Sequence, residues 1–115
     1  MSPAPGTAFQ YQIEVIKDAN DFNVTVIKCQ GRLVSENKEE LRKVVQPLIQ
    51  RGGRIALDFA DVQYLDSSGL GAVVGLKVSA INRGLCVLEL RNLTPRIKQL
   101  LSMSNLLQLL TGSSE

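Results

Sequence analysis

The sequence predicts a single α/β domain in which a mixed β-sheet packs against helices, with the element order β-β-α-β-α-β-α-(β). Stretches that alternate apolar and polar residues, or that are rich in β-branched residues, predict the strands. Apolar residues at helical spacing between these stretches predict the helices, and Gly or Pro marks the boundaries. The length of 115 residues, 44% of them hydrophobic, fits one domain with a proper core. A hairpin followed by right-handed β-α-β crossovers would join these strands into one mixed sheet.

A β-hairpin is predicted near the N-terminus. Residues 11–17 alternate apolar and polar side chains for most of their length, as a half-buried strand does. Residues 18–21 supply Asp and Asn for a turn, and residues 22–30 are rich in β-branched side chains. We expect Gly31 to end this second strand.

The chain beyond Gly31 changes to the period of a helix with one buried face. Ser35 or Asn37 is the expected N-cap, and Gly52 is expected to end the helix because glycine adopts the left-handed conformation cheaply. Burying each side chain of the apolar stripe contributes about 1.5–3 kcal/mol, so this helix should dock on a sheet. The stripe consists of Leu41, Val44, Val45, Leu48 and Ile49.

The second half repeats the alternation of strand and helix. Residues 54–60 are mostly apolar and suit a central strand, residues 61–66 are expected to form a loop, and residues 67–81 a helix that Gly84 closes. Residues 85–90 form another largely buried strand. The stripe of the 67–81 helix consists of Leu70, Val73, Val74, Lys77 and Ile81.

A last helix is predicted to begin at Thr94-Pro95. Thr caps a helix well, and Pro at the first position lacks only an N–H that would have no partner there. Residues 106–110 are an ambiguous apolar run that could form an edge strand, and residues 112–115 are a tail. The buried side of this helix should consist of Ile97, Leu100 and Leu101.

Residues 1–10 are rich in Pro, Gly and Ala and carry no charge, which predicts a flexible segment ahead of one domain over residues 11–111. This segment lacks the basic and apolar regions of a secretory signal, and no apolar stretch reaches the roughly 18 residues of a membrane span. We therefore expect a cytoplasmic protein. In that setting Cys29 and Cys86 are expected to be small core residues rather than a disulfide or redox pair.

The composition argues against several kinds of chemistry. The chain has no His, which removes Ser/His and Cys/His pairs and the commonest transition-metal ligand. The net charge is only +2 and no Lys/Arg run occurs, so nucleic-acid binding is not favoured. Arg91, Arg96 and Lys98 could form a basic patch, or they are solvated surface charges. We expect no enzymatic activity, no metal and no cofactor.

The most informative segment lies between residues 65 and 71. Gly69, Gly71 and Gly75 fall within a predicted helix, where each costs about 1 kcal/mol relative to Ala. Either close helix–sheet packing or a small-residue surface open to another protein would explain them. Asp66 is the expected N-cap, which places Ser67 in the first turn with no base nearby to activate it.

The string Leu65-Asp66-Ser67-Ser68-Gly69-Leu70-Gly71, read L-D-S-S-G-L-G after a strand and a short loop, resembles the signature of the STAS family of anti-sigma factor antagonists. The resemblance extends from about Tyr11 to Leu110. Gly31-Arg32-Leu33 ahead of an amphipathic helix, and Thr94-Pro95 opening the last helix, support it.

The resemblance implies a STAS-like domain that binds an anti-sigma factor and thereby frees a sigma factor. It also implies that the anti-sigma factor, acting as a serine kinase, phosphorylates Ser67, and that a PP2C-type phosphatase restores the hydroxyl. Where many members carry acidic residues, this chain has Arg32 and Val34, which bears on the identity of the partner. The implied partner-binding residues are Asp66, Ser67, Ser68, Gly69, Leu70 and Gly71.

Other interpretations stay open at this point. Asp58, Asp61 and Asp66 could form the acidic cluster of a phosphoacceptor or a two-carboxylate enzyme, which would need a concave site around them, or they are turn and capping residues. Nucleotide binding at Gly69-Leu70-Gly71 is disfavoured because the lysine and spacing of a phosphate-cradling loop are missing. A further alternative keeps the fold and makes the chain an accessory subunit of a lipid-transport or stress-signalling complex.

Overall fold

The computed structural model describes residues 9–103, which form one four-stranded sheet and the helices packed on it. The element order agrees with the predicted β-β-α-β-α-β-α, and the possible strand at residues 106–110 lies outside the described residues. The elements are β1 (Phe9–Lys17), β2 (Asn23–Leu33), α1 (Lys38–Arg51), β3 (Gly53–Leu65), α2 (Ser67–Arg83), β4 (Cys86–Arg91) and α3 (Pro95–Met103).

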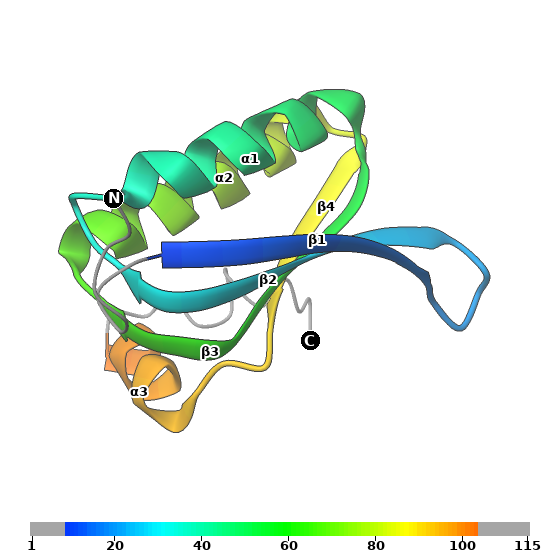
Figure 1. Cartoon of the computed structure of the whole chain (residues 1–115). Coiled ribbons are helices and arrows are strands. Elements are labelled where there is room, and N and C mark those ends of the chain that lie inside the picture. The colour runs from blue at the N-terminus through cyan, green and yellow to red at the C-terminus, as the bar shows by residue number, and fades with distance from the viewer. Residues whose placement is uncertain (1–8, 104–115) are drawn as a thin grey trace.

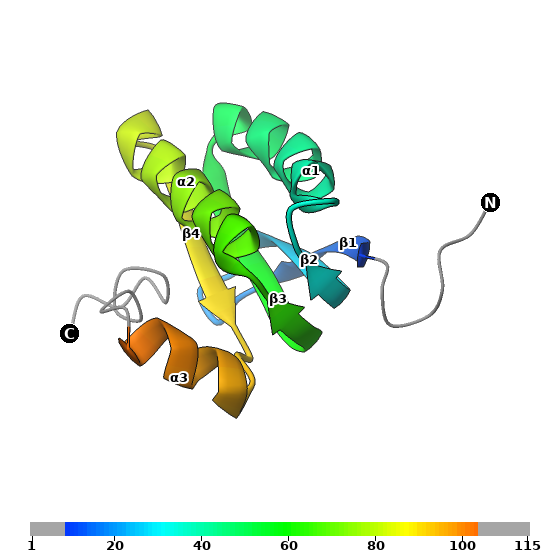
Figure 2. The same ribbon diagram turned by 90° about the vertical axis from the view of Figure 1, so that its left-hand side faces the viewer.

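The sheet is mixed, as expected, with the strand order β1-β2-β3-β4. β1 and β2 form an antiparallel hairpin, whereas β2, β3 and β4 run parallel through helical crossovers. α1 and α2 lie side by side on one face of the sheet, and α3 lies on the other side of β3 and β4 (Figures 1 and 2). The main core fills the space under the two long helices.

Two central strands are longer than predicted. β2 continues through Gly31 to Leu33, and β3 runs on to Leu65, so the expected strand end at Gly31 and the expected loop at 61–66 are both wrong. β2 and β3 stay paired in parallel along this extension because the pairing register shifts twice. Gly31 adopts a positive φ of 94° beside the second shift, a conformation that glycine reaches at little cost. The extension carries β3 directly to the start of α2.

The first strand begins at Phe9, two residues before the predicted boundary. Phe9 pairs with Gly31 and its side chain is buried in the main core, although its surroundings in the sequence are polar or small. The alternation of apolar and polar residues that predicts the strand from residue 11 extends back through Gln10 to Phe9.

The α1 helix confirms the predicted stripe, and Asn37, one of the two predicted candidates, stands at the N-cap position, but its side chain makes no capping hydrogen bond to the helix. The Asn37 side chain instead accepts the Val34 N–H at 2.9 Å and donates to the Arg32 carbonyl at 2.9 Å, which ties the end of β2 to the helix. Gly52 ends α1 as predicted, with a φ of 80° and its N–H bonded to carbonyls of the last turn.

The buried face of α2 is rotated relative to the prediction. Ile81, a member of the predicted stripe, is 55% exposed. Lys77, another member, is buried as predicted, and its ammonium donates to the Leu88 carbonyl at 2.6 Å. Burial lowers the pKa of Lys77. Small residues allow this face to approach the sheet; the buried set is Gly69, Ala72, Val73, Leu76, Lys77 and Ala80.

The predicted strand at residues 85–90 is shifted by one residue and is buried on one face only, because β4 begins at Cys86 and the side chains of Leu85 and Val87 are 78% and 46% exposed. Thr94 caps α3 by accepting the Ile97 N–H at 3.3 Å, and Ile97 is buried as expected, whereas Leu100 is exposed. Cys29 and Cys86 are free and buried, and burial, helped by the nearby Asp58 charge, raises the pKa of the Cys29 thiol to about 12. Among the described residues, no helix has the length and apolar character needed to cross a membrane.

Candidate functional site

The motif occupies the junction between β3 and α2. Asp66 has extended backbone angles and caps α2 as predicted, because its Oδ1 accepts the Gly69 N–H at 2.7 Å. Its second oxygen accepts the Ser35 N–H at 3.2 Å, and its own N–H donates to the Leu33 carbonyl at 3.3 Å. One aspartate therefore fixes the start of α2 to the segment that follows β2.

The three glycines in the first half of α2 differ in the space that surrounds each of them. A Cβ at Gly69 would overlap the carbonyl oxygen of Leu33, so this position requires glycine for close packing of α2 on β2. A Cβ at Gly71 would meet nothing, and Gly71 is exposed. At Gly75 a Cβ would make only an ordinary contact, 3.5 Å from the guanidinium of Arg42. Close packing therefore explains Gly69, whereas a surface open to another protein stays a prediction for the exposed Gly71.

The two serines differ in their exposure. Ser67, the first residue of α2, is exposed, whereas Ser68 is half-buried. Ser67 lies at the positive end of the α2 helix dipole, where the first turn contains no acidic residue and the Asp66 cap accepts the Gly69 N–H. Of the remaining motif residues, Asp66 and Leu70 are half-buried and Gly69 is buried.

A cavity of about 660 Å³ lies beside Ser67. The motif contributes one wall, with Leu65, Asp66, Ser67 and Leu70, and α3 contributes the other. No local sequence pattern indicates that α3 reaches the motif, because these two segments are far apart in the chain. The residues from α3 are Arg96, Ile97, Gln99, Leu100 and Met103, which combine one cation and one amide with three apolar side chains.

Arg32, noted as a departure from the family pattern, lies on the other side of Asp66. Its guanidinium stacks over the ring of Tyr64, 4.7 Å from the ring centroid. Arg32, Tyr64 and Asp66 line a second, more polar depression together with Val34 and Glu36. An arginine therefore lies on each side of Asp66: Arg96 lines the cavity that contains Ser67, and Arg32 lines the second depression.

The acidic residues do not form a catalytic or metal cluster. Asp58 accepts the N–H of Ala60 at 3.0 Å, Asp66 caps α2, and Asp61 is exposed. Within residues 9–103, no group of three or more His, Cys, Asp or Glu side chains is placed to hold a metal ion. Asp66 therefore has the capping role that the sequence also allowed, whereas Asp58 and Asp61 lie within β3 and not in a turn.

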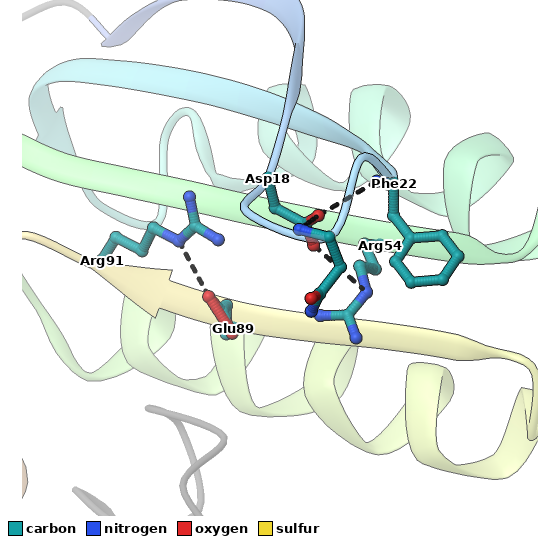
Figure 3. Close-up of polar contacts among 6 residues, drawn as sticks. Asp18, Phe22, Arg54, Glu89 and Arg91 are labelled. Carbon is teal, nitrogen blue, oxygen red and sulfur yellow. Dashed lines mark hydrogen bonds and ion pairs between the residues drawn. The ribbon is translucent and has the colours of Figure 1, made fainter.

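The predicted basic patch is divided between two places. Arg91 forms an ion pair with Glu89 at 2.8 Å on β4, while Arg96 lines the cavity beside Ser67. Figure 3 shows Arg91 and Glu89 on the same part of the sheet as Arg54, whose guanidinium approaches Asp18 (4.0 Å) and the Phe22 ring. The contacts of Arg91 and Arg54 with carboxylates indicate a local ionic network rather than an open patch.

Comparison with known proteins agrees with this geometry. A family model described as Mlab, STAS domain, matches residues 16–111. The anti-sigma-B factor antagonist of Bacillus subtilis is 28% identical over 103 residues, covering 90% of this chain and 91% of that protein. The anti-sigma F factor antagonist of Paenibacillus polymyxa is 28% identical over 89 residues, covering 76% and 75%.

A solved structure confirms the fold. The anti-sigma factor antagonist SpoIIAA in its unphosphorylated form superposes with a TM-score of 0.68 at 23% identity, covering 92% of this chain and 90% of the other. The likeness includes the sheet and the helices that position the β3–α2 junction.

Proposed function

The chain belongs to the STAS domain family, and on that premise we propose that it is an anti-sigma factor antagonist. In its unphosphorylated form it binds an anti-sigma factor, so that a sigma factor is released. The anti-sigma factor is also a serine kinase, and its transfer of phosphate to Ser67 ends the binding. A PP2C-type phosphatase reverses the modification, and the exchange takes place in the cytoplasm.

The exposure of Ser67 on a fixed helix start supports this proposal most directly. Asp66 holds the first turn of α2 through Gly69 and ties it to Ser35, so the backbone that carries the Ser67 hydroxyl is held in place. Ser67 is exposed, while the neighbouring Ser68 is half-buried and less accessible. A kinase active site can therefore reach Ser67 without unfolding the helix.

The surface around Ser67 suits a protein partner. Gly71 leaves the outer side of the first turns bare, and the cavity between the motif and α3 offers apolar contact next to the serine. Ser67, Leu70 and Gly71 would then contact the partner directly. Asp66 and Gly69 would act through positioning, because one caps the helix and the other packs against β2.

A phosphate on Ser67 should act at this surface rather than on the fold. It adds about −1.5 to −2 charges, which the positive end of α2 accommodates. A partner carboxylate about 6 Å away would experience roughly 3 kcal/mol of repulsion per charge at an effective dielectric constant near 20. Since about 1.4 kcal/mol corresponds to tenfold in affinity, a loss of about 100-fold is reachable without refolding.

The test uses the anti-sigma factor kinase from the same organism, purified with this chain and ATP. Mass spectrometry should place phosphate on Ser67, and Ser67→Ala should bind the kinase and stay bound in ATP. Ser67→Glu should bind weakly, while Ser68→Ala serves as the matched control and should still be phosphorylated. Phosphate on Ser68, or equal affinity of Ser67→Ala and Ser67→Glu by calorimetry, would overturn the assignment.

The alternative role, an accessory subunit of a lipid-transport or stress-signalling complex, uses the same fold. The two curated relatives are both named as antagonists of anti-sigma factors, which favours the antagonist role. The Asp66-Ser67 pair favours it as well, because an accessory subunit that is not phosphorylated has no need of an accessible serine there.

A further inference from the structure

β1 is a long and regular edge strand. It pairs with β2 along all nine of its residues, from Phe9↔Gly31 to Lys17↔Asn23, without a register shift. No strand among residues 9–103 pairs with its other edge. Such an edge presents a row of unpaired backbone N–H and C=O groups, which is a template for another strand.

The strand lacks the features that usually protect an edge. Between Phe9 and Lys17 there is no Pro and no bulge, and the one lysine stands at the end of the strand. The charge of Glu14 is engaged by Lys28 at 3.1 Å. On one face of the strand the exposed side chains are apolar, with Tyr11 40%, Ile13 50% and Val15 62% exposed.

These exposed side chains continue the helix-covered face of the sheet. Tyr11 pairs with Cys29 and Ile13 with Ile27, and both partners belong to the main core. Paired residues in a sheet point to the same face. The apolar strip on β1 is thus an extension of the core beyond the area that α1 covers.

The sequence of β1 is complementary to itself. In an antiparallel pairing centred on Ile13, Ile13 faces its own copy, Tyr11 faces Val15, and Gln12 faces Glu14. Aromatic and β-branched side chains are favourable cross-strand pairs. A register centred on Glu14 would oppose two carboxylates, which is unfavourable, so the register centred on Ile13 is preferred.

We propose that β1 pairs antiparallel with β1 of a second copy of this chain, about a two-fold axis at Ile13. The pairing is closed, because each copy uses the same edge, and it joins two sheets into one. The motif with Ser67 follows β3, which β2 separates from β1. The proposed dimer can therefore be tested independently of the proposed phosphorylation of Ser67.

Light scattering of the full chain after size exclusion tests the proposal. At high concentration the wild type should have twice the chain mass of 12.6 kDa. Ile13→Lys would bring two ammonium groups together at the axis, so its dimer dissociation constant should rise by at least about tenfold. Gln12→Lys is the matched control, because it places the same charge opposite Glu14 and should leave the dimer intact.

A cysteine pair tests the register. Ile13→Cys should form a disulfide-linked dimer with oxidised glutathione as the oxidant, since residues directly opposite across two antiparallel strands have Cβ atoms about 4.5–5.5 Å apart. Gln12→Cys should not, because its side chain is on the other face and opposes Glu14. A wild type that is monomeric at every concentration, or a dimer that Ile13→Lys leaves unchanged, would overturn the proposal.

Discussion

The carboxylate of Asp66 accepts the backbone N–H of Gly69 at 2.7 Å, and this contact sets the direction in which α2 leaves the sheet. Its other oxygen accepts the Ser35 N–H from the segment after β2. The residue before the exposed serine thus connects two crossovers of the sheet.

Asp66→Ala should lower the free energy of unfolding by about 1 kcal/mol, the usual cost of losing a helix N-cap. Asp66→Asn keeps an oxygen that can accept the Gly69 N–H, so it should lose less. Urea denaturation of both variants measures the difference. If the two variants were equally destabilised, the cap would not be the reason for Asp66.

Gly69→Ala should destabilise the protein by about 1–3 kcal/mol, the usual cost of overpacking, because the added methyl group overlaps the Leu33 carbonyl oxygen. Gly71→Ala should instead stabilise it by up to about 1 kcal/mol, since Ala favours the helix and its methyl group meets nothing. Denaturant midpoints of the two variants should therefore move in opposite directions.

Gly71→Ala also separates stability from binding. Its methyl group lies on the surface proposed to meet the anti-sigma factor, so calorimetry should find weaker binding by a more stable protein. Unchanged affinity would show that the partner does not approach the outer side of the first turns of α2.

Met103→Glu should weaken binding of the anti-sigma factor by at least about tenfold, because it places a charge in the apolar part of the cavity beside Ser67. Met103 is exposed, so the fold should be retained. Ile81→Glu is the matched control: Ile81 is another exposed apolar residue, but it does not line this cavity. Equal losses in both variants would argue against the cavity as a contact surface.

The turn between β1 and β2 should contribute to acid sensitivity. Asp18 accepts the N–H groups of Phe22 and Asn20, and the Phe22 hydrogen bond is the main cause that lowers the pKa of Asp18 below 3.8. A lowered folded-state pKa gives a contribution that is complete above the unfolded value and is lost as the pH falls through the folded value.

Asp18→Asn removes this titration. Urea unfolding of the wild type should therefore show an additional loss of stability as the pH falls below about 3.8, which the variant should not show. Identical slopes of unfolding free energy against pH for the two proteins would contradict the assignment.

The parts of the site that are local in sequence were predictable. Asp66 as N-cap and the glycine-rich first turns of α2 follow from residues a few positions apart, and Thr94 as the cap of α3 follows in the same way. Capping and helix propensity are short-range effects, so the residues that create them are visible in one window of sequence.

The parts that depend on distant contacts were not predictable. The extension of β3 to Leu65 requires pairing with the end of β2, and the cavity wall from α3 requires its packing beside the motif. The exposed Ile81 and the buried Ala72 and Ala80 differ from the predicted stripe because small residues, rather than the largest apolar ones, bring α2 close to the sheet.

The burial of the two native thiols makes site-specific labelling of this protein possible. Cys29 and Cys86 are buried, and burial raises the pKa of both, so maleimide reagents at neutral pH should leave them unmodified. A single cysteine introduced on the surface would then carry a fluorophore alone, without replacement of the native residues. Partner exchange at the β3–α2 junction could be followed in real time on an otherwise wild-type chain.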